Sequence, residues 1–131
     1  MLIAMKVVVG LIGLLLAVGL GLRWMFVPET VGAELGITLG DIVALSTARA
    51  DLGGMFLGAG TLCALGLRSG EGRWLQAAAV LIGAVAVGRA LGLVLDGYAT
   101  QLLIFLVVEL VMVGALLTAA ARMARARGEP A

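Results

Sequence analysis

The segment Arg49-Ala50-Asp51-Leu52-Gly53-Gly54 places two opposite charges and a glycine pair inside an otherwise apolar stretch of chain. Unpaired charge is costly in the interior of a membrane, so ionisable side chains in such a segment tend to face other helices or a water-filled cavity. The first question for the rest of the chain is therefore which segments supply partners for Arg49 and Asp51.

Composition defines the class of protein. Of the 131 residues, 63% are hydrophobic and 13% are charged, and the mean hydropathy is +1.19, which predicts a single integral membrane domain over residues 1–131. The net charge of +1 argues against a nucleic-acid partner. With no histidine and one cysteine, Cys63, the chain lacks the usual ligands of metal and haem sites. We therefore predict no metal, no cofactor and no catalytic residue, and an enzyme is the less favoured class.

Four apolar stretches are long enough to cross a membrane as helices: residues 2–22, 42–67, 74–95 and 100–122. The first would measure about 31 Å as a helix, which matches the hydrocarbon thickness of a bilayer. A signal peptide is the alternative for this first stretch, but no cleavage site followed by a soluble domain is present, and further apolar stretches come after it. The predicted fold is all-α, a four-helix transmembrane bundle.

A fifth, shorter helix is predicted between the first two spans. Pro28 is tolerated at a first helical position, and Gly36 ends the segment, so we expect a surface or re-entrant helix over residues 28–35. It is either a plain surface connection or a lid over the bundle. Trp24 is expected at the membrane interface, and Asp41 is expected to cap the second span.

The charges are distributed unevenly between the two ends of such a bundle. One end collects Lys6, Arg68, Arg73, Arg122, Arg125 and Arg127, and the other collects Arg23, Glu29, Glu34, Asp41 and Asp96. The positive-inside rule then predicts a multi-pass protein of the cell inner membrane with both termini, and the basic tail over residues 122–131, in the cytoplasm.

Charged residues on three spans are predicted to lie at a similar depth. Arg49, Asp51, Arg89 and Glu109 lie roughly 9 to 13 Å from the outer ends of their helices at 1.5 Å per residue, and Asp96 lies near the outer surface. In one interpretation these residues form a closed network of ion pairs that fixes the helix register. In the other, part of the network is open and binds a polar headgroup beneath the short helix, since arginine donors suit carboxylates and phosphates.

Glycines at small-residue spacing predict close helix packing. These are Gly53, Gly54, Gly58, Gly88 and Gly92. Because such faces serve contacts within and between chains alike, the sequence leaves open whether the protein is a homo-oligomer.

A set of short motifs resembles a known family. They are Pro28 after the first span, Arg49 followed by Gly53-Gly54, Gly88-Arg89, Asp96-Gly97, and Glu109 in the last span. Together they resemble a family of small four-helix bacterial membrane proteins catalogued only as a domain of unknown function. The resemblance implies a bundle in the bacterial inner membrane and supplies no activity. Small multidrug transporters have a similar length, but their defining acidic residue lies in the first helix, where this chain has only Lys6.

The function predicted from these features is binding of a lipid headgroup or small amphipathic molecule through Arg49 and Arg89, with Asp51 and Glu109 positioning them. Membrane lipids are the predicted partners. Two alternatives remain: a small proton- or ion-coupled transporter that uses the charges as a relay, and a structural or accessory membrane subunit.

Overall fold

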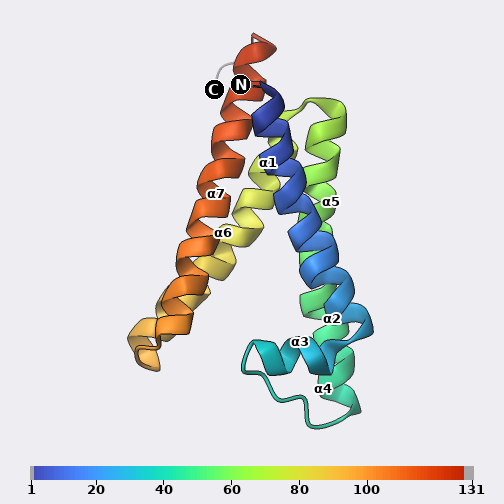
Figure 1. Ribbon diagram of the computed structural model, residues 1–131, viewed down its shortest axis with the longest axis vertical. Helices are drawn as coiled ribbons and strands as arrows, with labels where there is room; N and C mark the ends of the chain where they lie inside the picture. Colours follow the sequence, from blue (N-terminus) through green and yellow to red (C-terminus); the bar gives the residue numbers. More distant parts are fainter. Residues whose placement is uncertain (1, 129–131) are drawn as a thin grey trace.

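The computed structural model describes residues 2–128, and within them every regular element is helical (Figure 1). The first long helix comprises α1 (Leu2–Leu14), a π-helical segment η1 (Leu15–Leu22) and α2 (Arg23–Phe26). The short helix α3 (Pro28–Glu34) follows. The second long helix comprises α4 (Ile42–Thr47), a π-helical segment η2 (Ala48–Gly53) and α5 (Gly54–Ser69). The last two are α6 (Gly72–Leu95) and α7 (Thr100–Ala126).

Four of these helical units are long and apolar enough to cross a membrane: Leu2–Phe26, Ile42–Ser69, Gly72–Leu95 and Thr100–Ala126. The predicted all-α bundle with an extra short helix is confirmed, and the chain has the helices of a multi-pass membrane protein. The last helix runs four residues beyond the predicted span because Met123 is buried in the core and holds the end of α7 against the bundle. Residues 129–131 of the predicted tail lie outside the described residues.

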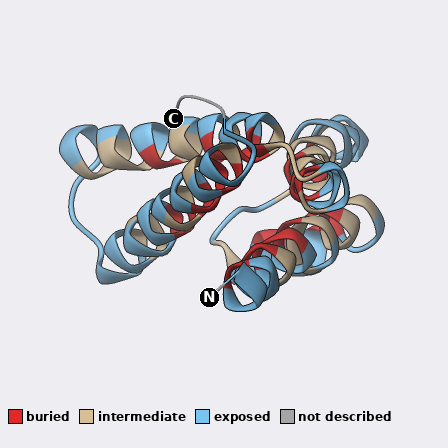
Figure 2. Ribbon diagram, turned by 90° about the horizontal axis from the view of Figure 1, so that it is seen from above, coloured by how far each residue is buried: buried red, intermediate tan, exposed pale blue. Residues whose placement is uncertain are grey.

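The helices form two halves that meet at one end and diverge at the other (Figure 1). α6 packs along α7 in one half, and α5 packs on α1 and η1 in the other, while contacts of α5 with α6 and of α1 with α7 join the halves. Both described ends of the chain lie where the halves meet, and α3 lies at the divergent end. Buried residues line the inward faces of the helices (Figure 2), and Leu16, Leu75, Ile82 and Leu116 form the centre of the core.

The residues predicted to begin or end the helices around α3 occupy the expected positions. Pro28 occupies the first turn of α3. At its end Gly36 takes a φ of +75°, a left-handed conformation that favours glycine, and the Ile37 and Gly36 amides donate to the Gly32 and Ala33 carbonyls at 2.7 and 3.3 Å. Asp41 Oδ1 accepts a 2.8 Å hydrogen bond from the Ala44 amide and caps α4. The chain therefore turns sharply at both ends of the connection that follows α3.

The predicted packing glycines differ in what surrounds them. A Cβ on Gly53 would lie 2.8 Å from Met25 Cγ, so this glycine allows a close helix contact. Nothing lies within 4 Å of the same position on Gly54, Gly58 or Gly88, and Gly92 faces only Asp96 Oδ2 at 3.6 Å, from its own helix end. The closest helix approaches occur instead at Gly21, Gly60 and Gly72. Spacing predicts that a small-residue face exists, but the larger apolar residues decide which face turns inward.

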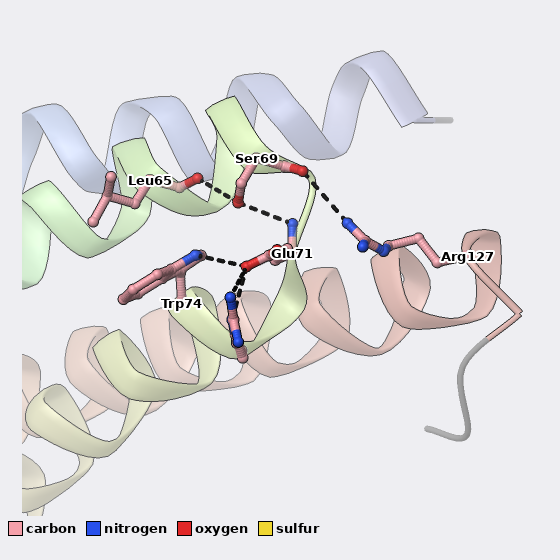
Figure 3. A network of polar contacts seen from close by, with 6 residues as sticks. Leu65, Ser69, Glu71, Trp74 and Arg127 are labelled. Atoms are coloured by element: carbon pink, nitrogen blue, oxygen red, sulfur yellow. Dashed lines mark hydrogen bonds and ion pairs between the residues drawn. The ribbon is translucent and has the colours of Figure 1, made fainter.

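Polar contacts fasten the end of the molecule where the halves meet (Figure 3). The Glu71 carboxylate accepts hydrogen bonds from Arg73 Nε at 2.7 Å and from Trp74 Nε1 at 3.1 Å. Arg127 Nη1 donates to the Ser69 carbonyl at 3.5 Å. These contacts tie the α5–α6 turn to the end of α7, and the arginine-rich end of the bundle is consequently the closed one.

Candidate functional site

A partly buried ion pair joins the two helices of one half. Arg89 on α6 donates from Nε to both carboxylate oxygens of Glu109 on α7, at 2.8 and 3.0 Å, and Arg89 Nη2 lies 2.7 Å from Glu109 Oε1. Glu109 is 8% exposed and is the only buried charged residue among residues 2–128. The guanidinium also lies 5.0 Å from the centre of the Phe105 ring. Charge-assisted bonds to both oxygens fix the guanidinium in orientation.

Two cavities adjoin this ion pair in the region where the halves diverge. The first has a volume of about 160 Å³ and is lined by both Arg89 and Glu109. The second, of about 330 Å³, is lined by Arg89 and by Trp24 of the opposite half. The residues common to both linings are Leu35, Phe56, Val85, Arg89 and Phe105. Because five residues are shared, the two cavities are neighbouring parts of one site, which we call the Arg89 site.

The short helix α3 forms part of the wall of the Arg89 site. Its Val31 packs in one cluster with Trp24 and Ala48, and the turn after it brings Leu35 and Ile37 into the lining. An exposed ion pair between Arg23 Nη2 and Glu34 Oε1, 2.7 Å apart, also holds the end of α3 against α2. The segment therefore packs against the bundle as part of the cavity wall.

Wide helical turns contribute to the wall as well. Leu20 belongs to η1 and Leu52 to η2, and each lines one of the two cavities. Short π-helical insertions in α-helices are frequent at functional sites because they change the direction of the side chains that follow. Here both lie next to the Arg89 site, and nothing in the residue types of these segments predicts them.

The structure divides the five charged residues that the sequence placed together. Arg89 and Glu109 meet, but Arg49 is exposed and its Nη1 donates to the Met25 carbonyl at the end of α2. Asp51 is exposed and lines a separate surface groove near Asp41. Asp96 is exposed at the C-terminal end of α6. One network of five charges is thus not formed, because similar depth along a helix does not fix the direction in which a side chain points.

Trp24 corrects a second expectation. Sequence reasoning placed this residue at the membrane interface, but it is 1% exposed, since α3 folds back across α2 and covers it. Its indole Nε1 is buried, and among residues 2–128 no group accepts a hydrogen bond from it. Phe56 and Val85 were likewise not identified from the sequence, because an apolar cavity wall and an ordinary core face have the same composition.

The Arg89 site is an apolar cavity with one ion pair in its wall, and the two charges of this pair balance each other. Arg89 Nε and Nη2 are engaged by Glu109, and Nη1 makes no hydrogen bond within residues 2–128. A hollow of this size lies near the lower limit of small-molecule pockets, which combine apolar walls with a few polar groups. The arrangement suits reversible binding of an amphipathic molecule.

Comparison with known proteins gives one match. No curated protein and no solved structure is similar enough to this chain to count as a match. The family model described as "Domain of unknown function (DUF4345)" matches residues 4–120, which include the second and third long helices, most of the first and last, and both residues of the Arg89–Glu109 pair. On this match over most of its length, the chain belongs to the DUF4345 family.

Proposed function

We propose that the protein binds a small amphipathic molecule, such as a membrane lipid, in the Arg89 site. The observation that carries the proposal is the position of one partly buried guanidinium in the lining of two adjoining apolar cavities. The apolar body of the ligand would lie against Phe56, Val85 and Phe105, and its polar group would face Arg89. Glu109 holds the guanidinium in place.

The part that Arg49 plays changes from the expectation based on sequence. Its guanidinium is engaged by the Met25 carbonyl, so Arg49 stabilises the end of α2 and is left out of the proposed site. In this proposal α3 closes the mouth of the site, and the ligand enters from the bilayer between the divergent halves. With the arginine-rich end in the cytoplasm, as the positive-inside rule predicts, the site opens in the outer half of the bilayer.

The test is a blocked cavity with a matched control. Val85 lines both cavities, whereas Val87, on the same helix, is 62% exposed on the outer face of the bundle. Native mass spectrometry of protein released from membranes reports which amphipathic molecules stay bound. We expect the wild type and Val87→Trp to retain a bound molecule that Val85→Trp lacks. Equal retention by all three proteins would contradict binding at this site.

A further inference from the structure

Trp24, in the wall of the second cavity, carries a hydrogen-bond donor for which the described residues supply no acceptor. Trp24 lines this cavity, is 1% exposed, and carries a buried indole N–H for which residues 2–128 supply no acceptor. The contrast within the chain is clear, because the other tryptophan, Trp74, donates its indole N–H to Glu71 at 3.1 Å. A buried tryptophan usually donates its indole N–H to an acceptor. The indole nitrogen can only donate, so an acceptor is the one kind of partner that satisfies it.

Arg89 supplies a second donor to the same cavity. Its Nε and Nη2 bind Glu109, and its Nη1 carries two N–H groups that make no hydrogen bond within residues 2–128. The other residues of this cavity are apolar, and the thioether of Met55 is at most a weak acceptor. Both oxygens of Glu109, in the adjoining cavity, already accept from Arg89. The site therefore offers donors to a ligand and has hardly any acceptor to offer.

The charge of the site points to an uncharged ligand group. Arg89 and Glu109 compensate each other, and no other charged residue lines either cavity. A carboxylate or phosphate would bring a charge into an apolar hollow that holds no counter-charge, which is expensive. A carbonyl oxygen has two lone pairs and no charge, and so it satisfies donors without that penalty.

We infer that the Arg89 site recognises an uncharged carbonyl group, such as that of an acyl ester, carried on an apolar body, with the Trp24 indole N–H and Arg89 as donors. The inference rests on the proposed function and specifies its ligand class. Two sources supply this chemistry: the ester groups of a bilayer phospholipid and a free acyl ester such as a monoacylglycerol. Trp24 is a binding residue in this assignment.

The experiment compares an ester with its ether analogue, which lacks only the carbonyl oxygen. Full-length protein carrying Trp74→Phe keeps Trp24 as its single tryptophan and reports binding by fluorescence. It is titrated in detergent with monoolein, with 1-O-oleylglycerol and with oleate. We expect monoolein to bind at least about tenfold more tightly than the ether, because each hydrogen bond lost with the carbonyl oxygen weakens binding by about that factor, and oleate to bind no more tightly than monoolein.

A variant tests whether Trp24 is the donor. Trp24→Phe keeps an aromatic ring and removes the N–H, and its binding is followed by native mass spectrometry because its fluorescence is lost. We expect its affinity for monoolein to fall towards that for the ether, because only the Arg89 donor remains, with the affinity for the ether unchanged. Circular dichroism confirms that the variant is folded, and the unchanged ether affinity shows that the cavity is intact.

The outcomes separate the two proposals. If neither monoolein nor the ether binds, the proposed function fails. If both bind equally and Trp24→Phe changes nothing, the proposed function stands and the assignment of a carbonyl ligand is overturned, as it also is if oleate binds most tightly. Displacement of monoolein by dioleoylphosphatidylcholine supports a bilayer lipid as the source of the ester, and its failure to displace supports a free acyl ester.

Discussion

Arg89 and Glu109, twenty residues apart in the chain, form a partly buried ion pair in which one guanidinium nitrogen contacts both carboxylate oxygens, at 2.8 and 3.0 Å. Removing one partner of a buried pair leaves the other charge uncompensated, which typically costs about 3–5 kcal/mol. We expect Arg89→Met, which leaves the buried Glu109 unpaired, to lower the free energy of unfolding by about 3 kcal/mol. Glu109→Met should lower it by less, because the Arg89 side chain is 25% exposed. Both are measured by circular dichroism during titration with sodium dodecyl sulfate.

The double variant is the control for this prediction. Arg89→Met combined with Glu109→Met leaves no unpaired charge, so its loss is expected to be smaller than the sum of the two single losses. Additive losses would mean that the two side chains stabilise the protein independently, in conflict with the contact between them.

Arg49 is predicted to act on stability and not on ligand binding. Its guanidinium caps the Met25 carbonyl at the end of α2, and hydrogen bonds to charged groups contribute about 1.5 kcal/mol or more. We expect Arg49→Met to lower the free energy of unfolding by about 1.5 kcal/mol while the affinity for monoolein stays unchanged. Asp51→Asn, two positions away on an exposed site, should change neither quantity. A loss of affinity in Arg49→Met would restore this residue to the binding site.

The contact between α3 and α2 is expected to depend on pH. The hydrogen bond from Arg23 lowers the pKa of Glu34 below its ordinary value of 4.5; burial opposes this shift in part, and the charge of Arg23 adds a smaller lowering. A lowered pKa in the folded state means that the stabilisation is present above pH 4.5 and is lost as the pH falls through the lowered pKa. Hydrogen exchange of residues 28–35 should therefore quicken, relative to the rest of the chain, when the pH falls below 4.5.

Glu34→Gln provides the comparison, because its side chain does not titrate. Exchange in this variant should show no such local acceleration in acid. If the variant and the wild type respond to acid in the same way, the Arg23–Glu34 pair is not what holds α3 in place.

Two glycines of α5 give a matched test of the packing. A Cβ on Gly60 would lie 2.6 Å from Ala17 Cβ and 2.7 Å from the Gly13 carbonyl oxygen, whereas nothing lies within 4 Å of that position on Gly58. Overpacking typically costs about 1–3 kcal/mol, and alanine is otherwise the better helix former. We expect Gly60→Ala to lower the free energy of unfolding by about 2 kcal/mol and Gly58→Ala to leave it unchanged or raise it slightly. The opposite order would contradict the rotation of α5 against α1.

The orientation in the membrane is open to a labelling test. In a Cys63→Ala background, cysteine is introduced at Thr38, in the connection after α3, or at Ala126, at the end of α7. Both positions are exposed, and they lie at opposite ends of the bundle (Figure 1). If the arginine-rich end faces the cytoplasm, a membrane-impermeant maleimide added to intact spheroplasts labels Thr38→Cys and spares Ala126→Cys until the cells are lysed. Labelling of Ala126→Cys alone would show that the arginine-rich end faces outward, opposite to the predicted orientation.

Composition and local signals in the chain were enough to predict the class of protein and the order of its helices. Four apolar stretches of spanning length predict four helices, and Pro28, Gly36 and Asp41 act on the backbone next to them, so local chemistry fixes where helices begin and end. Depth along a helix also follows from the sequence, which is why Arg89 and Glu109 could be matched in level before any contact was known.

The tertiary structure alone decided which side chains meet. The rotation of each helix about its axis depends on how the apolar side chains of neighbouring helices pack together. This packing involves many residues, so no single motif predicts it. That rotation turned Arg49 to the Met25 carbonyl and left Arg89 with Glu109. The fold-back of α3 over Trp24 likewise follows from contacts between distant segments. Because of this fold-back, Trp24, which was expected at the membrane surface, is a buried hydrogen-bond donor beside a cavity.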